Sequence, residues 1–166
     1  MKKFIFPLMI MTSLVILFTA CPYSSSVPID NPSVKVDKNL LGKWVKASDQ
    51  SSEHPTFYEI SQLDNFKYNI VKNEYNSYDS AYSKTAYVGY ISKIDNLSFL
   101  NMQQDGKGDY FLHKIELGNN EFTFFEVTDN IDEKFNTSDE LKAFVKKYMN
   151  LSFFYNKDEE RYTKNK

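Results

Sequence analysis

The side chains of this chain that could take part in catalysis are few. His54 lies between Glu53 and Pro55 in a polar stretch, whereas His113 follows Leu112 in an apolar one. Neither histidine has a second histidine two or four positions away, the spacing that would place two imidazoles on one face for a metal ion. No serine lies in a Gly-x-Ser-x-Gly motif, and there is no glycine-rich phosphate loop. We therefore expect a solvated loop residue in His54, a satisfied sheet residue in His113, and no enzymatic activity.

The acidic clusters also lack the pattern of a metal site. Asp129, Asp132 and Glu133 gather around Asn130, but they lack the glycine and the distal glutamate of a calcium loop. The run Asp158-Glu159-Glu160 is typical of a solvated, charged segment. The sequence thus predicts no catalytic residue, no metal ligand and no cofactor.

Cys21 is the single cysteine of the chain, which excludes an intramolecular disulfide and a thiolate metal cluster. A basic pair, Lys2-Lys3, and a largely apolar stretch over residues 4–17 precede it, a pattern typical of a secretory signal rather than a membrane-spanning helix. The segment from Phe18 to Cys21 resembles the lipobox of bacterial lipoproteins, with Phe18 where leucine is usual. The resemblance implies a lipoprotein signal peptide over 1–20 and acylation of Cys21. The alternative is a cleaved leader followed by an incidental cysteine.

The lipobox resemblance also implies a location. Fatty acyl chains such as palmitate on Cys21 would anchor the protein in a bacterial cell envelope, at the outer membrane or the cell surface, because two or more chains give stable anchoring. Residues 21–39 are rich in Ser, Pro and Asn and predict a flexible tether, since proline at this density keeps a chain extended. The membrane is thus one expected partner.

Composition favours one domain with a large aromatic core. The chain has 166 residues, enough for one domain, and its 14 Phe and 12 Tyr supply apolar area for a core or a lined cavity. Beyond the basic pair of the leader, 18 basic side chains stand against 22 acidic ones. That balance argues against nucleic acid as a partner, because phosphate binding needs a concentrated basic surface.

Residues 40–166 alternate in the manner of antiparallel strands, which makes them the expected folded domain. Seven strands are predicted, with a mobile loop over 73–83 between the third and the fourth; the strands are 41–47, 56–60, 66–71, 85–94, 97–102, 110–117 and 121–127. Turns rich in Asn and Gly join most of them, which is typical of a meander.

The spacing of the apolar residues changes from that of a strand to that of a helix after Thr137. Thr137 and Glu140 form a capping-box pair, and apolar residues recur at helical spacing over 141–149. We expect this stripe to pack on the sheet, the alternative being a stripe that lies on lipid. Segments 153–155 and 160–163 predict a closing strand or two. The expected fold class is mainly β, an antiparallel up-and-down barrel of about eight strands with one C-terminal amphipathic helix before the last strand.

The first predicted strand carries the only tryptophan, in Gly42-Lys43-Trp44. Together with the meander and the late helix, this Gly-x-Trp resembles the signature of lipocalin-like (calycin) proteins. In that family a basic side chain of the last strand covers the tryptophan at the closed end of the barrel. The only arginine, Arg161, lies in that strand. The resemblance therefore implies that Trp44 and Arg161 touch, in a cation–π arrangement.

A barrel of this size holds either side chains alone or one small ligand, and the sequence leaves both open. The candidate ligand-binding residues are alternating apolar positions of the strands: Phe66, Tyr68, Ile70, Phe122 and Phe124. The first hypothesis is a lipid-anchored carrier of a small apolar or amphipathic molecule. The second is an envelope module, such as an inhibitor or assembly factor, that has a filled barrel and binds a protein through its loops. The tyrosine-rich stretch over 73–83 suits either a contact loop or a disordered one.

Overall fold

The computed structural model describes residues 23–128, 130–157 and 159–165. Cys21 and the predicted signal peptide lie outside the described residues. The strands are β1 (Ser24–Ser25), β2 (Gly42–Lys46), β3 (Phe57–Gln62), β4 (Tyr68–Asn76), β5 (Ala81–Ile94), β6 (Leu97–Gln104), β7 (Tyr110–Leu117), β8 (Glu121–Glu126) and β9 (Glu160–Lys164). The helices are α1 (Ser138–Tyr148) and three 3-10 turns, η1 (Lys38–Leu40), η2 (Ala47–Asp49) and η3 (Ser152–Phe154).

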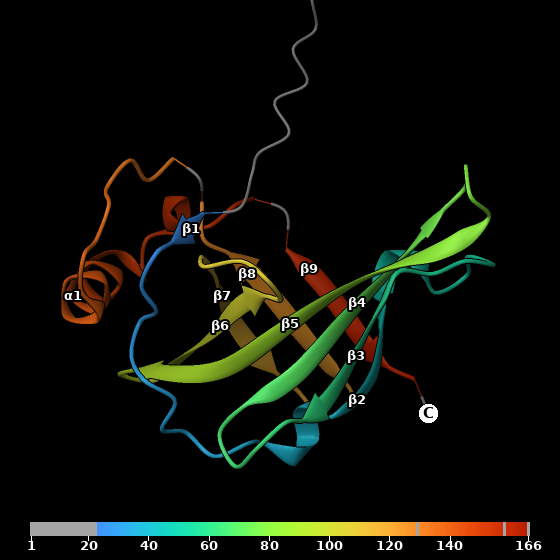
Figure 1. Ribbon diagram of the computed structural model, residues 1–166, viewed down its shortest axis with the longest axis horizontal. Helices are drawn as coiled ribbons and strands as arrows, with labels where there is room; N and C mark the ends of the chain where they lie inside the picture. The colour runs from blue at the N-terminus through green and yellow to red at the C-terminus, as the bar shows by residue number, and fades with distance from the viewer. Residues whose placement is uncertain (1–22, 129, 158, 166) are drawn as a thin grey trace, which may run out of the picture.

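Strands β2 to β9 close into one antiparallel barrel (Figure 1). Each of these eight strands pairs with its neighbour in the chain, and the barrel closes where β9 lies between β8 and β2. Closure pairs the edges that an open meander would expose. The predicted fold class is confirmed: the protein is a mainly β barrel with one helix before the last strand. This architecture is compatible with a lipocalin-like fold.

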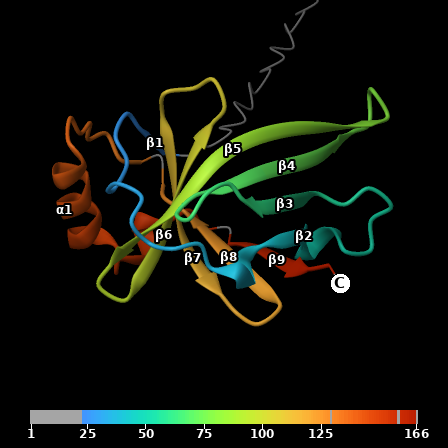
Figure 2. The same cartoon turned by 60° about the horizontal axis from the view of Figure 1, so that its bottom comes forward.

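The barrel has two distinct ends. The β3–β4 turn, the β7–β8 turn and η1 lie at one end, which we call the closed end. The β6–β7 turn, the start of β9 and the short strand β1 lie at the other, the open end. Figures 1 and 2 show these groups on opposite sides, with β1 above the barrel and the β7–β8 turn below.

Aromatic side chains fill the half of the barrel next to the closed end. Trp44, Tyr68, Phe122 and Tyr162 are completely or almost completely buried. The ring of Phe122 meets the edge of Trp44 at 4.8 Å between centroids and stacks on Tyr162 at 5.0 Å. Such pairs add stability beyond area burial, and they leave this half without room for a ligand.

A lysine, not the predicted arginine, covers Trp44 at the closed end. Lys164 stands opposite Trp44 in the β2–β9 register, and its Nζ lies 5.1 Å from the indole centroid. Arg161 projects outward, 56% exposed, within 3.9 Å of Glu121 and 3.7 Å of Glu159. The expected kind of contact is present, but Arg161 was the wrong residue: Lys164 shares the inward side of β9 with Tyr162, and odd positions face out.

The Gly-x-Trp motif and η1 close this end together. The indole Nε1 of Trp44 donates to the Leu40 carbonyl at 2.8 Å, and Lys164 Nζ donates to the Asn39 carbonyl at 2.9 Å. Gly42 adopts a φ of +126°, and a Cβ there would lie only 3.1 Å from Lys164 Cε. Only glycine suits both the conformation and the space. The 3-10 turn before the first barrel strand had no recognised signal in the sequence.

The expected flexible tether is instead a strap packed along the outside of the barrel. Residues 23–37, which we call the strap, run from β1 at the open end to η1 at the closed end (Figure 1). Tyr23 and Ile29 are buried in it. Asp30 binds two elements, β5 and α1: its carbonyl accepts from Tyr90 Oη at 2.8 Å, and its carboxylate accepts from Ser92 and from Lys142 Nζ. Proline keeps the strap extended, but a few apolar side chains and one aspartate fix it to the barrel.

We predict that Asn101→Ala releases the strap. Asn101 is fully buried, and its Oδ1 accepts from the Ile29 N–H at 2.9 Å while its Nδ2 donates to Ser92 Oγ at 2.8 Å. Alanine would leave the Ile29 N–H buried without its acceptor, at a cost of about 1–3 kcal/mol. Hydrogen exchange should quicken over residues 23–37 first. Asn69→Ala, on the outer surface of β4, should leave exchange there unchanged; equal effects of both variants would contradict this role.

Helix α1 packs on the outer face of the barrel, as the amphipathic pattern predicts. Leu141, Val145 and Met149 are buried against Phe99 and Leu112 of the sheet in a second core. The capping box is present: Thr137 Oγ1 accepts from the Glu140 N–H, and the Glu140 carboxylate accepts from the Thr137 N–H. Among the described residues, no helix has the length and apolarity needed to cross a membrane.

The tyrosine-rich stretch expected as a mobile loop is a paired β-hairpin. Strands β4 and β5 stay in register out to Asn76 and Ala81, and Figure 2 shows them reaching beyond the barrel as an arm. Tyr75 stacks on His54 at 3.7 Å and meets the edge of Tyr82 at 5.5 Å. These rings stabilise the arm, and Tyr78 at its tip is 97% exposed.

Candidate site: a cavity at the open end

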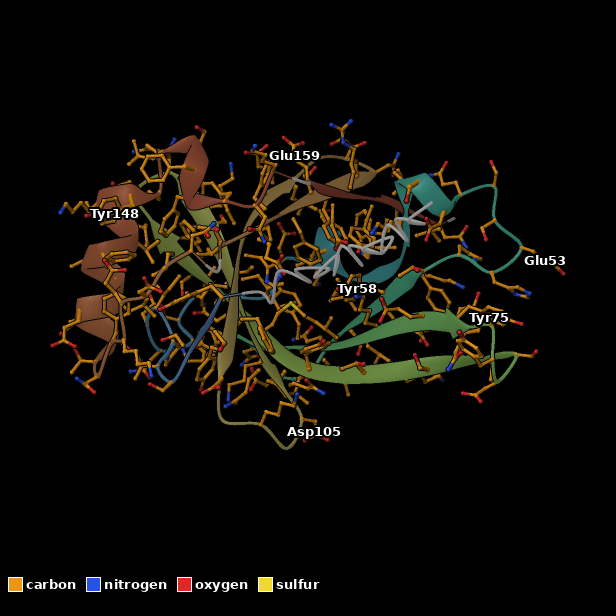
Figure 3. All side chains as sticks on the ribbon, turned by 90° about the horizontal axis from the view of Figure 1, so that it is seen from above. Glu53, Tyr58, Tyr75, Asp105, Tyr148 and Glu159 are labelled. Atoms are coloured by element: carbon orange, nitrogen blue, oxygen red, sulfur yellow. The ribbon has the colours of Figure 1, made fainter. Side chains whose placement is uncertain are left out.

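The open half of the barrel contains a cavity of about 850 Å³ that opens to solvent. Seen from above, Tyr58 lies inside the ring of strands, between Glu159 and Asp105 on opposite sides of the rim (Figure 3). The cavity is lined by inward residues of β3 to β9 and by the loops on either side of α1: Tyr58, Lys72, Tyr87, Met102, Phe111, His113, Glu126, Thr128, Asn130, Ser152, Phe153, Tyr155, Asn156, Lys157 and Glu160. The interior is therefore filled at one end and hollow at the other.

None of the five predicted ligand-binding residues lines this cavity. Tyr68, Ile70, Phe122 and Phe124 point inward as expected, but they are buried in the aromatic half below it. Phe66 is 36% exposed and lies in the β3–β4 turn rather than in a strand. The strand alternation therefore predicted the inward face correctly for four of the five residues. These four lie in the core next to the closed end instead of in the cavity wall.

A partly exposed ion pair lies beside the cavity. Lys46 Nζ lies 2.7 Å from Glu160 Oε1, and Tyr162 Oη donates to Glu160 Oε2 at 2.8 Å. Burial alone would raise the pKa of Glu160, but hydrogen bonds from Lys46 and Tyr162 and the charge of Lys46 outweigh it and lower the pKa. Glu160 is therefore an ionised carboxylate facing the cavity. Of the run expected to be solvated, Glu159 is exposed, and the partly exposed Glu160 is in addition bound to Lys46 and Tyr162.

His113 lines the cavity, but one of its ring nitrogens is buried away from it. Its side chain is 14% exposed, and its Nδ1 is buried with no hydrogen-bond partner among the described residues. Its Nε2 lies 3.8 Å from Glu126 Oε1, too far for a hydrogen bond. Burial lowers the pKa of His113 to about 4, so the imidazole is neutral at physiological pH. The expected sheet position is confirmed, but the expected full satisfaction of its polar atoms was wrong.

The walls of the cavity combine charged and apolar side chains. Glu126 accepts from Asn156 Nδ2 at 2.7 Å, and Lys72 pairs with Glu74 at 2.8 Å. Tyr87 meets the edge of Phe111 at 6.4 Å, and this aromatic pair forms part of the apolar wall. The site can therefore accept hydrogen bonds and donate them, and it can also bury apolar surface.

The other residues considered for chemistry lie apart from the cavity. His54 is exposed and stacks on Tyr75 in the arm. Across the described parts of the chain, no three His, Cys, Asp or Glu side chains are grouped so as to hold a metal ion. Asp129 and Asp158 lie outside the described residues.

Several lining residues could have been found from the strand alternation. In the predicted strand 110–117, His113 shares a face with Phe111 and Ile115, and Lys72 continues the inward series of Tyr68 and Ile70.

Comparison of the chain with protein families, curated proteins and solved structures found no match.

Proposed function

We propose that this protein is a lipid-anchored, lipocalin-like binding protein that holds one small amphipathic molecule in the cavity at its open end. The observation that carries this proposal is the hollow half-barrel of about 850 Å³, lined by charged side chains, an imidazole and an aromatic wall. Its volume falls in the range of about 300–1,000 Å³ that small-molecule sites occupy.

The polarity of the cavity favours an amphipathic ligand over a purely apolar one. A hydrocarbon would bury Glu160, Lys72 and His113 without replacing the water around them, which costs free energy. A molecule with a hydroxyl, amide or amine group can pair with Lys72 or with the carboxylates of Glu126 and Glu160. Its apolar part would then lie against Tyr87, Phe111 and Phe153.

The envelope location in this proposal rests on the sequence. The lipobox-like residues before Cys21 support acylation, and the two lysines and apolar stretch before them support secretion. An acylated Cys21 would hold the barrel at a bacterial membrane, which suits a carrier of molecules with an apolar part.

The second candidate function is binding of a protein partner in the envelope. The observation that favours it is the β4–β5 arm, which projects from the barrel and exposes Tyr78 almost completely. Exposed tyrosine is common at recognition surfaces. The two functions use different parts of the molecule, so variants of the cavity and of the arm separate them.

Titration with the amphipathic dye 1-anilinonaphthalene-8-sulfonate tests the cavity. We expect Phe111→Ala to weaken dye binding about tenfold, because it removes an aromatic wall worth about 1.5 kcal/mol of contact. Phe125→Ala is the matched control: Phe125 is also half-buried, on the neighbouring strand, but it lies outside the barrel under Lys114. Near-UV circular dichroism would show that both variants stay folded. Equal affinities of parent and Phe111→Ala would contradict the assignment of the cavity.

A further inference from the structure

The first described residues of the chain are fixed at the rim of the open end. Tyr23 is buried, and its N–H donates to the Val127 carbonyl at 3.4 Å. Ser24 and Ser25 then pair with Phe111 and Tyr110 at the start of β7. Phe111 is itself a wall residue of the cavity. The strap therefore begins beside the mouth of the site.

Cys21 precedes Tyr23 by only two positions, and two extended residues span at most about 7 Å. The strap cannot detach to increase the distance between Cys21 and the rim of the barrel, because Tyr23, Ile29 and Asp30 are bound to the barrel. We propose that the open end of the barrel lies against the surface of the lipid bilayer, with the cavity opening toward the membrane. This inference rests on the proposed acylation of Cys21.

The rim carries side chains suited to a bilayer interface. Phe153, at the mouth of the cavity, is 70% exposed, and Leu151 beside it is also exposed. The arm with Tyr78 at its tip leaves the barrel at its open end and projects sideways from it (Figures 1 and 2). Tyrosine favours the membrane interface, where its apolar ring and its hydroxyl are both accommodated, and exposed Phe and Leu side chains can be buried in the headgroup boundary.

The closed end offers a competing apolar pair, and the position of the anchor decides between the two ends. Leu63 and Phe66 are exposed in the β3–β4 turn, at the opposite end from β1. An acyl chain attached two residues before Tyr23 cannot bring that end to the bilayer without turning the whole barrel over. The closed end is therefore expected to face away from the membrane. A ligand with an apolar part would pass between bilayer and cavity with little exposure to water.

A pair of matched tryptophan variants tests this orientation. The acylated mature protein is reconstituted in vesicles of phosphatidylethanolamine and phosphatidylglycerol that contain phosphatidylcholine brominated near the headgroup, which quenches tryptophan. Phe153→Trp places the probe at the open end and Phe66→Trp at the closed end. Trp44 is buried at the closed end in every variant, and the parent gives its background.

We expect Phe153→Trp to be quenched at least about twofold more strongly than Phe66→Trp, since interfacial side chains reach about 5–10 Å into the headgroup boundary. The orientation would be overturned if the protein floats with the vesicles and the two variants are quenched equally. It would also be overturned if Phe66→Trp is quenched more strongly, or if neither variant is quenched. Failure to float, or a fatty-acid label that persists in Cys21→Ala, would overturn the proposed anchoring and the orientation with it. A long Gly-Ser insertion after Pro22 should reduce the difference between the two variants.

Discussion

Replacing Trp44 by alanine is expected to lower the free energy of unfolding by about 3–5 kcal/mol, the largest loss of any single substitution considered. Trp44 is completely buried, packs its ring on Phe122 and donates to the Leu40 carbonyl. Alanine would leave a large void at the closed end and remove the donor for a buried carbonyl. Urea unfolding followed by far-UV circular dichroism measures the change without using tryptophan fluorescence.

Arg161→Ala is the control for this prediction. Its side chain is mostly exposed, and its two acidic neighbours lie at the long end of ion-pair distances. We expect a change within about 0.5 kcal/mol, as for most surface positions. If Arg161→Ala destabilised the barrel as much as Trp44→Ala, the assignment of Lys164 as the residue that covers the indole would be wrong.

The protein is also expected to lose about 3 kcal/mol of stability between pH 6.5 and pH 4 through His113 alone. Burial lowers the pKa of this imidazole in the folded protein to about 4, whereas in the unfolded chain it stays near 6.5. The unfolded state therefore binds more protons in this window, so stability rises with pH across it and is lost as the pH falls. Below pH 4 both states are protonated, and His113 causes no further loss.

Urea unfolding of His113→Leu at pH values from 4 to 7 tests the origin of this loss. The variant should show a flatter dependence on pH, whereas His54→Leu should keep the parent dependence because His54 is exposed outside the cavity. Glu160 acts in a lower window: its lowered pKa adds stability that is lost as the pH falls below about 4.5. An unchanged curve for His113→Leu would show that this imidazole is not held neutral by burial.

The strand alternation was enough to predict the barrel, because local patterns and global closure agree in this chain. The predicted strand 110–117 coincides with β7, and the capping box at Thr137 marks the start of α1. The register failed at Phe66 because Asp64 Oδ1 accepts from the N–H groups of Phe66 and Lys67 at 2.7 and 2.8 Å. That turn keeps Phe66 out of the strand, which begins at Tyr68.

The features that composition could not reveal depend on contacts distant in sequence. The composition of the strap is polar and rich in proline, yet Ile29 and Asp30 attach it to the barrel. Their partners, Asn101 and Tyr90, lie more than 55 residues away in the sequence. The choice of Lys164 over Arg161 depends on the register of β9 against β2. The cavity exists because the aromatic core fills only one end of the barrel, which depends on how those rings pack.

Native mass spectrometry of the purified, folded protein tests the central claim most directly. If the open end binds a small amphipathic molecule, the spectrum should show the chain with one additional mass, lost on collisional activation and reduced in Phe111→Ala but retained in Phe125→Ala. The binding function would be contradicted by protein, purified without detergent, whose spectrum shows only the bare chain and which does not bind 1-anilinonaphthalene-8-sulfonate.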